Sequence, residues 1–124
     1  MSLEKVLIYK NRAQLDDNMT YSQVSAVANT YTLDTQNHLN KTFAIETTDT
    51  NAKTIAFANV ASTAGTINTI LIRLKYTSAA AITYPTVTWQ NAIVPTFAAG
   101  KRYYILFTNL NLGDGWIASS IGAW

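Results

Sequence analysis

The alternation of large apolar residues in the second half of the chain constrains the fold more than any other feature. Residues 69–77 read TILIRLKYT, and every second residue is large and apolar: Ile70, Ile72, Leu74 and Tyr76. Residues 102–108 read RYYILFT and place Tyr103, Ile105 and Phe107 in the same way. Because side chains on a strand point alternately to opposite faces, both patterns predict β-strands with one face in the core.

Turn-forming stretches separate these segments at short intervals. They read ASTAGT at 61–66, TSAAA at 77–81, FAAGK at 97–101 and NLGDG at 111–115. Such spacing is typical of a sandwich or small barrel, so we expect an all-β fold, an antiparallel β-sandwich of jelly-roll type with a short N-terminal arm. Pro85 and Pro95 lack a backbone donor and are expected at a strand end, an edge or a bend.

The first part of the chain is less regular. A length of 124 residues corresponds to one domain, and no internal repeat is visible. Residues 12–40 are compatible with a short helix, an irregular arm or one further strand around residues 30–33. We expect an N-terminal arm or docking segment over 1–30 and the β-sandwich over 31–124. Residues 3–9 favour β-structure, and they form either a docking arm or a strand of the main sheet.

Composition excludes several classes of function. The net charge is +2, only 13% of residues are charged, and there is no cysteine. Scattered cations do not form the basic stripe that nucleic acid requires. No apolar run approaches the ~20 residues of a membrane span, and the N-terminus lacks the apolar core of a signal peptide. We therefore expect a protein made in the cytoplasm, with no nucleic-acid or membrane partner.

Catalytic groups are scarce. His38 is the single histidine and lies in a polar stretch without a nucleophile motif, and Asp114 is the single acid after residue 53. Acid–base and nucleophilic catalysis need such groups in pairs. A small hydrolase is therefore the least favoured alternative, and we predict no catalytic residue, no metal site and no cofactor.

Apolar residues also fall on the strand faces opposite the predicted core. Leu71, Tyr104 and Leu106 alternate with the core positions, and Trp124 ends the chain. A soluble monomer rarely exposes such a face, so these four residues are predicted to form an interface between copies of the chain. Burial of several hundred Å² per face would contribute on the order of 10 kcal/mol before association costs.

Residues 82–116 resemble a module that recurs in bacteriophage structural proteins, in capsid-decoration proteins, head fibres and tail-fibre tips. The resemblance rests on residues 82–85 (ITYP), Trp89, Pro95, Gly100, residues 103–107 (YYILF) and 115–116 (GW). Residues 90–92 (QNA) depart from it, because such modules often carry a glycine pair there. The resemblance implies a β-sandwich that commonly assembles as a homotrimer and has no catalytic residues.

Two functions are compatible with these features. The first is a virion protein that decorates or cements a phage capsid, with Leu3, Val6, Leu7, Ile8 and Tyr9 docking on the major capsid protein or another virion protein by strand addition. The alternative is the receptor-binding tip of a tail fibre or baseplate. It would recognise a bacterial surface glycan through two loops that contain Asn91, Asn109, Asp114 and Trp116.

Overall fold

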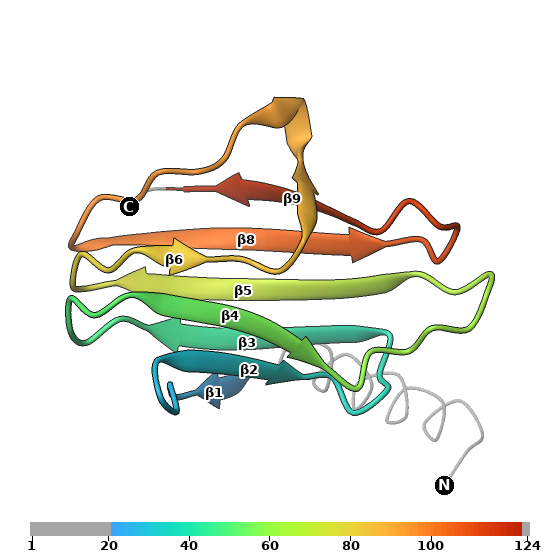
Figure 1. Cartoon of the computed structure of the whole chain (residues 1–124), viewed down its shortest axis with the longest axis horizontal. Coiled ribbons are helices and arrows are strands. Elements are labelled where there is room, and N and C mark those ends of the chain that lie inside the picture. The colour runs from blue at the N-terminus through green and yellow to red at the C-terminus, as the bar shows by residue number, and fades with distance from the viewer. Residues whose placement is uncertain (1–20, 123–124) are drawn as a thin grey trace, which may run out of the picture.

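The computed structural model describes residues 21–122, and this part of the chain is all-β, with one short 3-10 turn (Figure 1). Six strands form sheet A in the order β1-β3-β5-β8-β9-β7, and three form sheet B in the order β2-β4-β6. The elements are β1 (Ser22–Val24), β2 (Thr30–Asp34), β3 (Asn40–Glu46), β4 (Lys53–Ala58), β5 (Asn68–Tyr76), β6 (Ile82–Thr83), β7 (Val87–Trp89), η1 (Gln90–Ala92), β8 (Lys101–Asn109) and β9 (Trp116–Ile121).

From β1 to β7 the chain crosses between the two sheets at every connection. Successive strands belong alternately to sheet A (β1, β3, β5, β7) and to sheet B (β2, β4, β6) (Figure 1). Residues that pair are 21, 24, 29 and 29 positions apart in β1–β3, β2–β4, β3–β5 and β4–β6.

The prediction of antiparallel pairing is correct for only part of the structure. β8 pairs antiparallel with β5 and with β9, whereas all other strand pairs are parallel. Parallel neighbours need a long crossover connection, which is usually a helix. For the parallel pairs from β1–β3 to β4–β6, a strand of the opposite sheet lies in the crossover, whereas β7 and β9 are joined through β8 of the same sheet. Sheet A is therefore mixed, and sheet B is parallel.

The predicted alternation is confirmed in both long strands. In β5, residues 70, 72, 74 and 76 are buried, and residues 71, 73 and 75 are half-buried or exposed. In β8, residues 103, 105 and 107 are buried. One core joins these side chains to Tyr31, Leu33 and Ile55 of sheet B. The two sheets therefore share a single apolar layer between their inner faces.

Aromatic rings extend this core toward β9 and β7. Phe57 of β4 contacts Phe107 and Trp116, with ring centroids 5.1 and 4.8 Å apart. Trp89 lies 6.2 Å from Phe107, and Phe97 lies 4.5 Å from Tyr103. Sheet B has half as many strands as sheet A, and these rings pack against the common core. Most large aromatic side chains of residues 82–116 therefore contribute to the packing of the core.

Part of the segment assigned to the N-terminal arm belongs to sheet A. Residues 22–24 form β1 and pair with β3, so sheet A includes residues before position 31. The strand expected around residues 30–33 is present as β2. Pro85 and Pro95 lie between strands, as predicted. The arm residues Leu3, Val6, Leu7, Ile8 and Tyr9 lie outside the described residues.

Candidate functional site

The outer side of sheet A carries a continuous set of large apolar side chains, which we call face A. It consists of Leu71 on β5, Tyr104 and Leu106 on β8, and Ile117 and Ile121 on β9. Leu71 lies opposite Leu106, and Tyr104 opposite Ile121. Tyr104 and Leu106 are each 36% exposed, Ile117 is 45% and Ile121 is 69% exposed. Face A is therefore an apolar surface that no described part of the chain covers fully.

Three of the four predicted interface residues lie together on face A. Leu71, Tyr104 and Leu106 are neighbours across β5 and β8, and Trp124 lies outside the described residues. Ile117 and Ile121 were not predicted, because serines interrupt the apolar pattern of β9 at residues 119 and 120. Both isoleucines lie an even number of positions apart, and this spacing could have indicated that they share one strand face.

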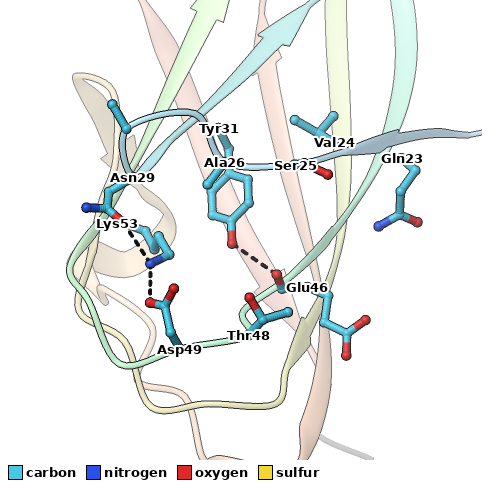
Figure 2. Close-up of a pocket in the computed structure, with 11 residues that line it drawn as sticks. Gln23, Val24, Ser25, Ala26, Asn29, Tyr31, Glu46, Thr48, Asp49 and Lys53 are labelled. Carbon is cyan, nitrogen blue, oxygen red and sulfur yellow. Dashed lines mark hydrogen bonds and ion pairs between the residues drawn. The ribbon is translucent and has the colours of Figure 1, made fainter.

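A polar hollow of about 470 Å³ opens beside the β1–β2 connection. Figure 2 shows Gln23, Ser25, Asn29, Thr48 and Asp49 around it. The β1–β2 segment forms one wall, and the connection from β3 to β4 forms the other. Amide, hydroxyl and carboxylate groups dominate this lining, so the hollow suits a polar ligand better than an apolar one.

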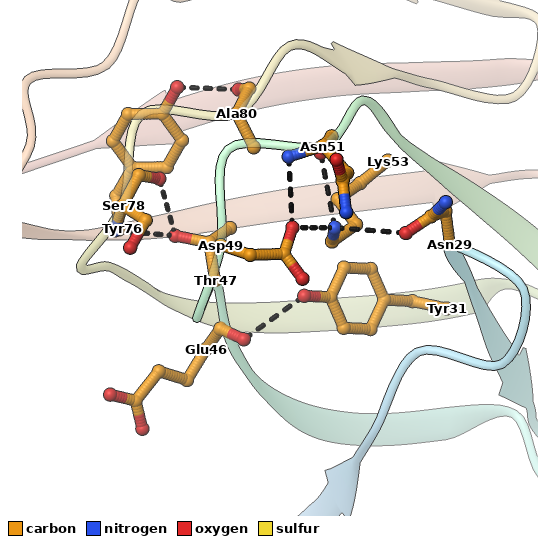
Figure 3. A network of polar contacts seen from close by, with 10 residues as sticks. All are labelled: Asn29, Tyr31, Glu46, Thr47, Asp49, Asn51, Lys53, Tyr76, Ser78 and Ala80. Carbon is orange, nitrogen blue, oxygen red and sulfur yellow. Dashed lines mark hydrogen bonds and ion pairs between the residues drawn. The ribbon is translucent and has the colours of Figure 1, made fainter.

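The buried ammonium of Lys53 organises one side of this hollow (Figure 3). Its side chain is 2% exposed, and Nζ donates to Asn29 Oδ1 at 3.1 Å, Asp49 Oδ1 at 2.5 Å and the Asn51 carbonyl at 3.1 Å. Three acceptors match the three protons of an ammonium group. Lys53 is therefore bound as a structural cation, and its position does not suit it to act as a nucleophile or base.

Parallel pairing of β2 with β4 brings this network together. Thr30 lies opposite Thr54, so Asn29 lies beside Lys53 although the two are distant in sequence. Asn29 has φ 64°, a left-handed conformation that asparagine tolerates better than most residues. The hydrogen bond from Lys53, and then that from the Asn51 N–H, hold the pKa of Asp49 below its usual value.

Further hydrogen bonds fix the connection between β3 and β4. Tyr31 Oη donates to the Glu46 carbonyl at 3.0 Å, and burial raises the pKa of Tyr31. Thr47 Oγ1 donates to the Ser78 carbonyl at 2.8 Å and accepts from the Ser78 N–H at 3.1 Å (Figure 3). The wall of the hollow is therefore fixed by hydrogen bonds, and those between Thr47 and Ser78 lie outside its lining.

The four residues predicted to contact a ligand do not form one site. Asn91 lines a separate hollow with Ser119 and Ser120, near the end of β9. Asn109 and Trp116 pair at the start of β9, and Asp114 lies in the loop between them. Trp116 packs on Phe57 and is only partly exposed, so part of its ring contributes to the packing between the sheets.

The Asn109 side chain is hydrogen-bonded within its own loop. Its Oδ1 accepts from the Asn111 N–H at 2.8 Å, and Asn111 Nδ2 donates to the Thr66 carbonyl at 3.0 Å. Asn111 itself has φ 54°. These bonds join the β8–β9 loop to the β4–β5 loop, and Asn109 thus serves loop structure.

Titratable side chains do not converge on a reactive centre in the part of the chain that the structure describes. His38 is exposed in the β2–β3 turn. The Asp34 carboxylate accepts two hydrogen bonds from Asn59 Nδ2 at 3.0 Å, which lower its pKa. Within residues 21–122, no three histidine or acidic side chains group as metal ligands, and no helix has the length and apolarity of a membrane span.

Comparisons with known proteins add no relationship. No protein-family model, no curated protein and no solved structure matches this chain. Functional inference therefore depends on the surfaces described above.

Proposed function

We propose that this protein is a non-enzymatic structural protein of a phage virion that decorates or cements the capsid. In this proposal the two sheets form a β-sandwich module, which associates through face A as a homotrimer and binds the assembled shell. Face A is the single observation that carries the proposal, because it leaves Leu106, Ile117 and Ile121 substantially exposed on adjacent strands.

Exposure of face A to water is unfavourable in free energy for an isolated chain. Large contiguous apolar patches are rare on monomeric proteins and mark interaction sites. Face A lies on regular strands that hold its side chains in fixed positions, and preorganised side chains lose little entropy on association. Association between identical copies would cover Leu71, Tyr104 and Leu106 together, since they are neighbours in register.

Docking on the shell is assigned to the N-terminal residues Leu3, Val6, Leu7, Ile8 and Tyr9. A segment rich in β-favouring residues can add a strand to an exposed sheet edge of a partner. The major capsid protein or another virion protein would supply that edge. The association face and the docking segment then have separate tasks.

Two measurements test this proposal. Quantification of the chain in purified particles should give many copies per shell, whereas a few copies at the tail would contradict decoration. Removal of residues 1–10 should abolish binding to assembled shells, while the self-association of the chain is unchanged. A matched control replaces the five docking residues with alanine at unchanged length. Unchanged shell binding by both variants would contradict the docking assignment.

The polar hollow supports a second candidate, a receptor-binding tip that recognises a bacterial surface glycan. Its volume and its mixed amide, hydroxyl and carboxylate lining fit a hydroxyl-rich ligand. Thr48→Val and Gln23→Leu together should remove glycan-array binding without changing the Lys53 network. The matched control is Thr32→Val on the outer side of sheet B. Binding that survives the double substitution would exclude the hollow as the receptor site.

A further inference from the structure

A second hollow, of about 170 Å³, lies on the outer side of sheet A, and we call it the basic hollow. Its shape follows from one row of residues across β1, β3 and β5. Ala44 lies opposite Gln23 on one side and Arg73 on the other. The short side chain of Ala44 leaves room between the two longer ones, and all three residues line the hollow. The strand register therefore forms a hollow with a small residue at its centre.

The next row on this side of the sheet carries most of the charge. Glu46, Lys75 and Arg102 lie opposite one another across β3, β5 and β8. Glu46 Oε1 lies 3.5 Å from Lys75 Nζ and also accepts from Thr77 Oγ1 at 3.0 Å. In the described part of the chain, Arg73 and Arg102 form no ion pair with a carboxylate. Three cations of the lining therefore share one carboxylate, and binding of a further anion would reduce their mutual repulsion.

The basic hollow adjoins the polar hollow. Gln23 and Glu46 belong to both linings. Figure 2 shows their side chains on the side of the polar hollow that is away from Lys53. Glu46 also begins the row that leads to Arg102, two strand spacings or about 10 Å away. A ligand longer than a single sugar ring can therefore extend from the polar hollow to the cations.

The two linings differ in the chemical groups that they suit. Amide and hydroxyl side chains of the polar hollow match the hydroxyl groups of sugars. Guanidinium groups of the basic hollow match a carboxylate with paired hydrogen bonds. A peptide would also present apolar side chains, which these polar linings suit less. The combination therefore favours a hydroxyl-rich ligand that carries a negative charge.

We propose that the two hollows together bind an acidic oligosaccharide. Its uncharged part lies in the polar hollow, and its carboxylate is bound by Arg73, Lys75 and Arg102. This inference deepens the second candidate function, glycan recognition, and rests on it. It narrows the ligand from hydroxyl-rich molecules in general to sugars that carry an acidic group.

The experiment is a glycan array on which each carboxylate-bearing oligosaccharide is printed beside its carboxyl-reduced, neutral form. We expect the acidic member of a pair to bind about tenfold more tightly at about 0.1 M salt, the size expected for two exposed ion pairs. The difference should disappear at about 1 M salt, where charges are screened beyond ~3 Å.

Substitutions separate the contributions of the two hollows. Arg73→Gln with Arg102→Gln should remove the acidic preference, while retained binding of the neutral form shows that the fold is intact. Glu46→Gln should increase the acidic preference, because it removes the carboxylate that competes for Lys75. Thr48→Val lies in the polar hollow only and should weaken both members of a pair by the same factor.

The matched control is Lys41→Gln with Lys101→Gln, which removes the same charge outside both linings and should leave the preference unchanged. Equal binding of acidic and neutral forms would overturn the inference and leave glycan recognition in place. Binding of neither form would contradict glycan recognition itself, and the inference with it. A polyglutamate peptide that binds as tightly as the acidic glycans would assign the basic hollow to a protein partner and also overturn the inference.

Discussion

The outer sides of the two sheets differ sharply although their inner sides are alike. Face A carries leucine, isoleucine and tyrosine. The outer side of sheet B, which we call face B, carries threonine and alanine, with Thr30, Thr54 and Thr83 in one row across β2, β4 and β6. Folding requires apolar residues on the inner faces only. The composition of an outer face therefore reports what that face contacts.

Face B needs no partner on this argument. Its side chains are short, and hydroxyl groups hydrogen-bond to water at little cost. Face A lies beside the charged side chains of Arg73, Lys75 and Arg102, an arrangement that resembles an interface with an apolar centre and a charged rim. The comparison predicts that equal changes on the two faces have unequal effects.

The largest expected effect concerns association. Leu71→Lys with Leu106→Lys should convert the proposed oligomer to a monomer, because two ammonium groups would be buried without partners. Thr32→Lys with Thr54→Lys makes the same change in charge on face B and should leave the oligomer intact. Sedimentation velocity measures both. A wild-type chain that is monomeric at all concentrations would remove the distinction between the faces.

Next in size are substitutions on the shared inner side. Ile105→Ala in sheet A and Ile55→Ala in sheet B remove side chains that are 0% and 2% exposed. Each should lower the free energy of unfolding by about 2–5 kcal/mol in urea titration. Thr54→Ala, next to Ile55 but on face B, should change it by less than about 0.5 kcal/mol. A small loss for Ile55→Ala alone would mean that sheet B contributes little to the core.

A smaller effect separates the hydroxyl groups of two tyrosines. Tyr31→Phe removes the hydrogen bond to the Glu46 carbonyl and should cost about 0.5–1.5 kcal/mol. The Tyr84 hydroxyl is buried without a partner among the described residues, and burial raises its pKa. Tyr84→Phe should therefore be neutral or stabilising in the same titration. Equal losses would indicate that the Tyr84 hydroxyl has a partner.

The smallest expected effect is the acid sensitivity of the sheet B side. Hydrogen bonds lower the pKa of Asp34 on β2 and of Asp49 beside Lys53. A lowered folded-state pKa stabilises the protein above the unfolded value of about 4, and this contribution disappears as the pH falls through the folded value. Asp34→Asn with Asp49→Asn should therefore flatten the decline in thermal midpoint between about pH 4 and pH 2. An unchanged decline would assign acid sensitivity to other groups.

Local strand pattern was predictable from the sequence, and strand partners were not. Alternation at residues 70–76 and 103–107 identified the inner face of both long strands, because side-chain direction alternates along a single strand. That alternation is the same in parallel and antiparallel sheets, so it could not reveal that β3 pairs parallel with β5. The turn stretches indicate where strands end, but not that residues 61–66 and 77–81 lead into the opposite sheet.

The candidate sites differ in the same way: some residues could be grouped from strand alternation, and others come together only through strand pairing. Leu71, Tyr104 and Leu106 share a face in any sheet in which their strands are neighbours, so their grouping was accessible from pattern alone. Lys53 with Asn29, and Arg73 with Arg102, come from distant parts of the chain and meet only through register. Nothing in the sequence around Lys53 distinguishes it from an exposed lysine.

The sequence by itself determined that this chain forms strands, which residues enter the core, and that apolar residues remain on a second face. Each of these depends on spacing along the chain and on side-chain size. Only the tertiary structure shows that the chain passes repeatedly between two sheets and that Trp116 lies against Phe57. The same holds for the polar hollow and for the hollow lined by Arg73, Lys75 and Arg102. These features depend on which distant strands pair and in which register. The register is set by the packing of the whole core, and not by any local stretch of sequence.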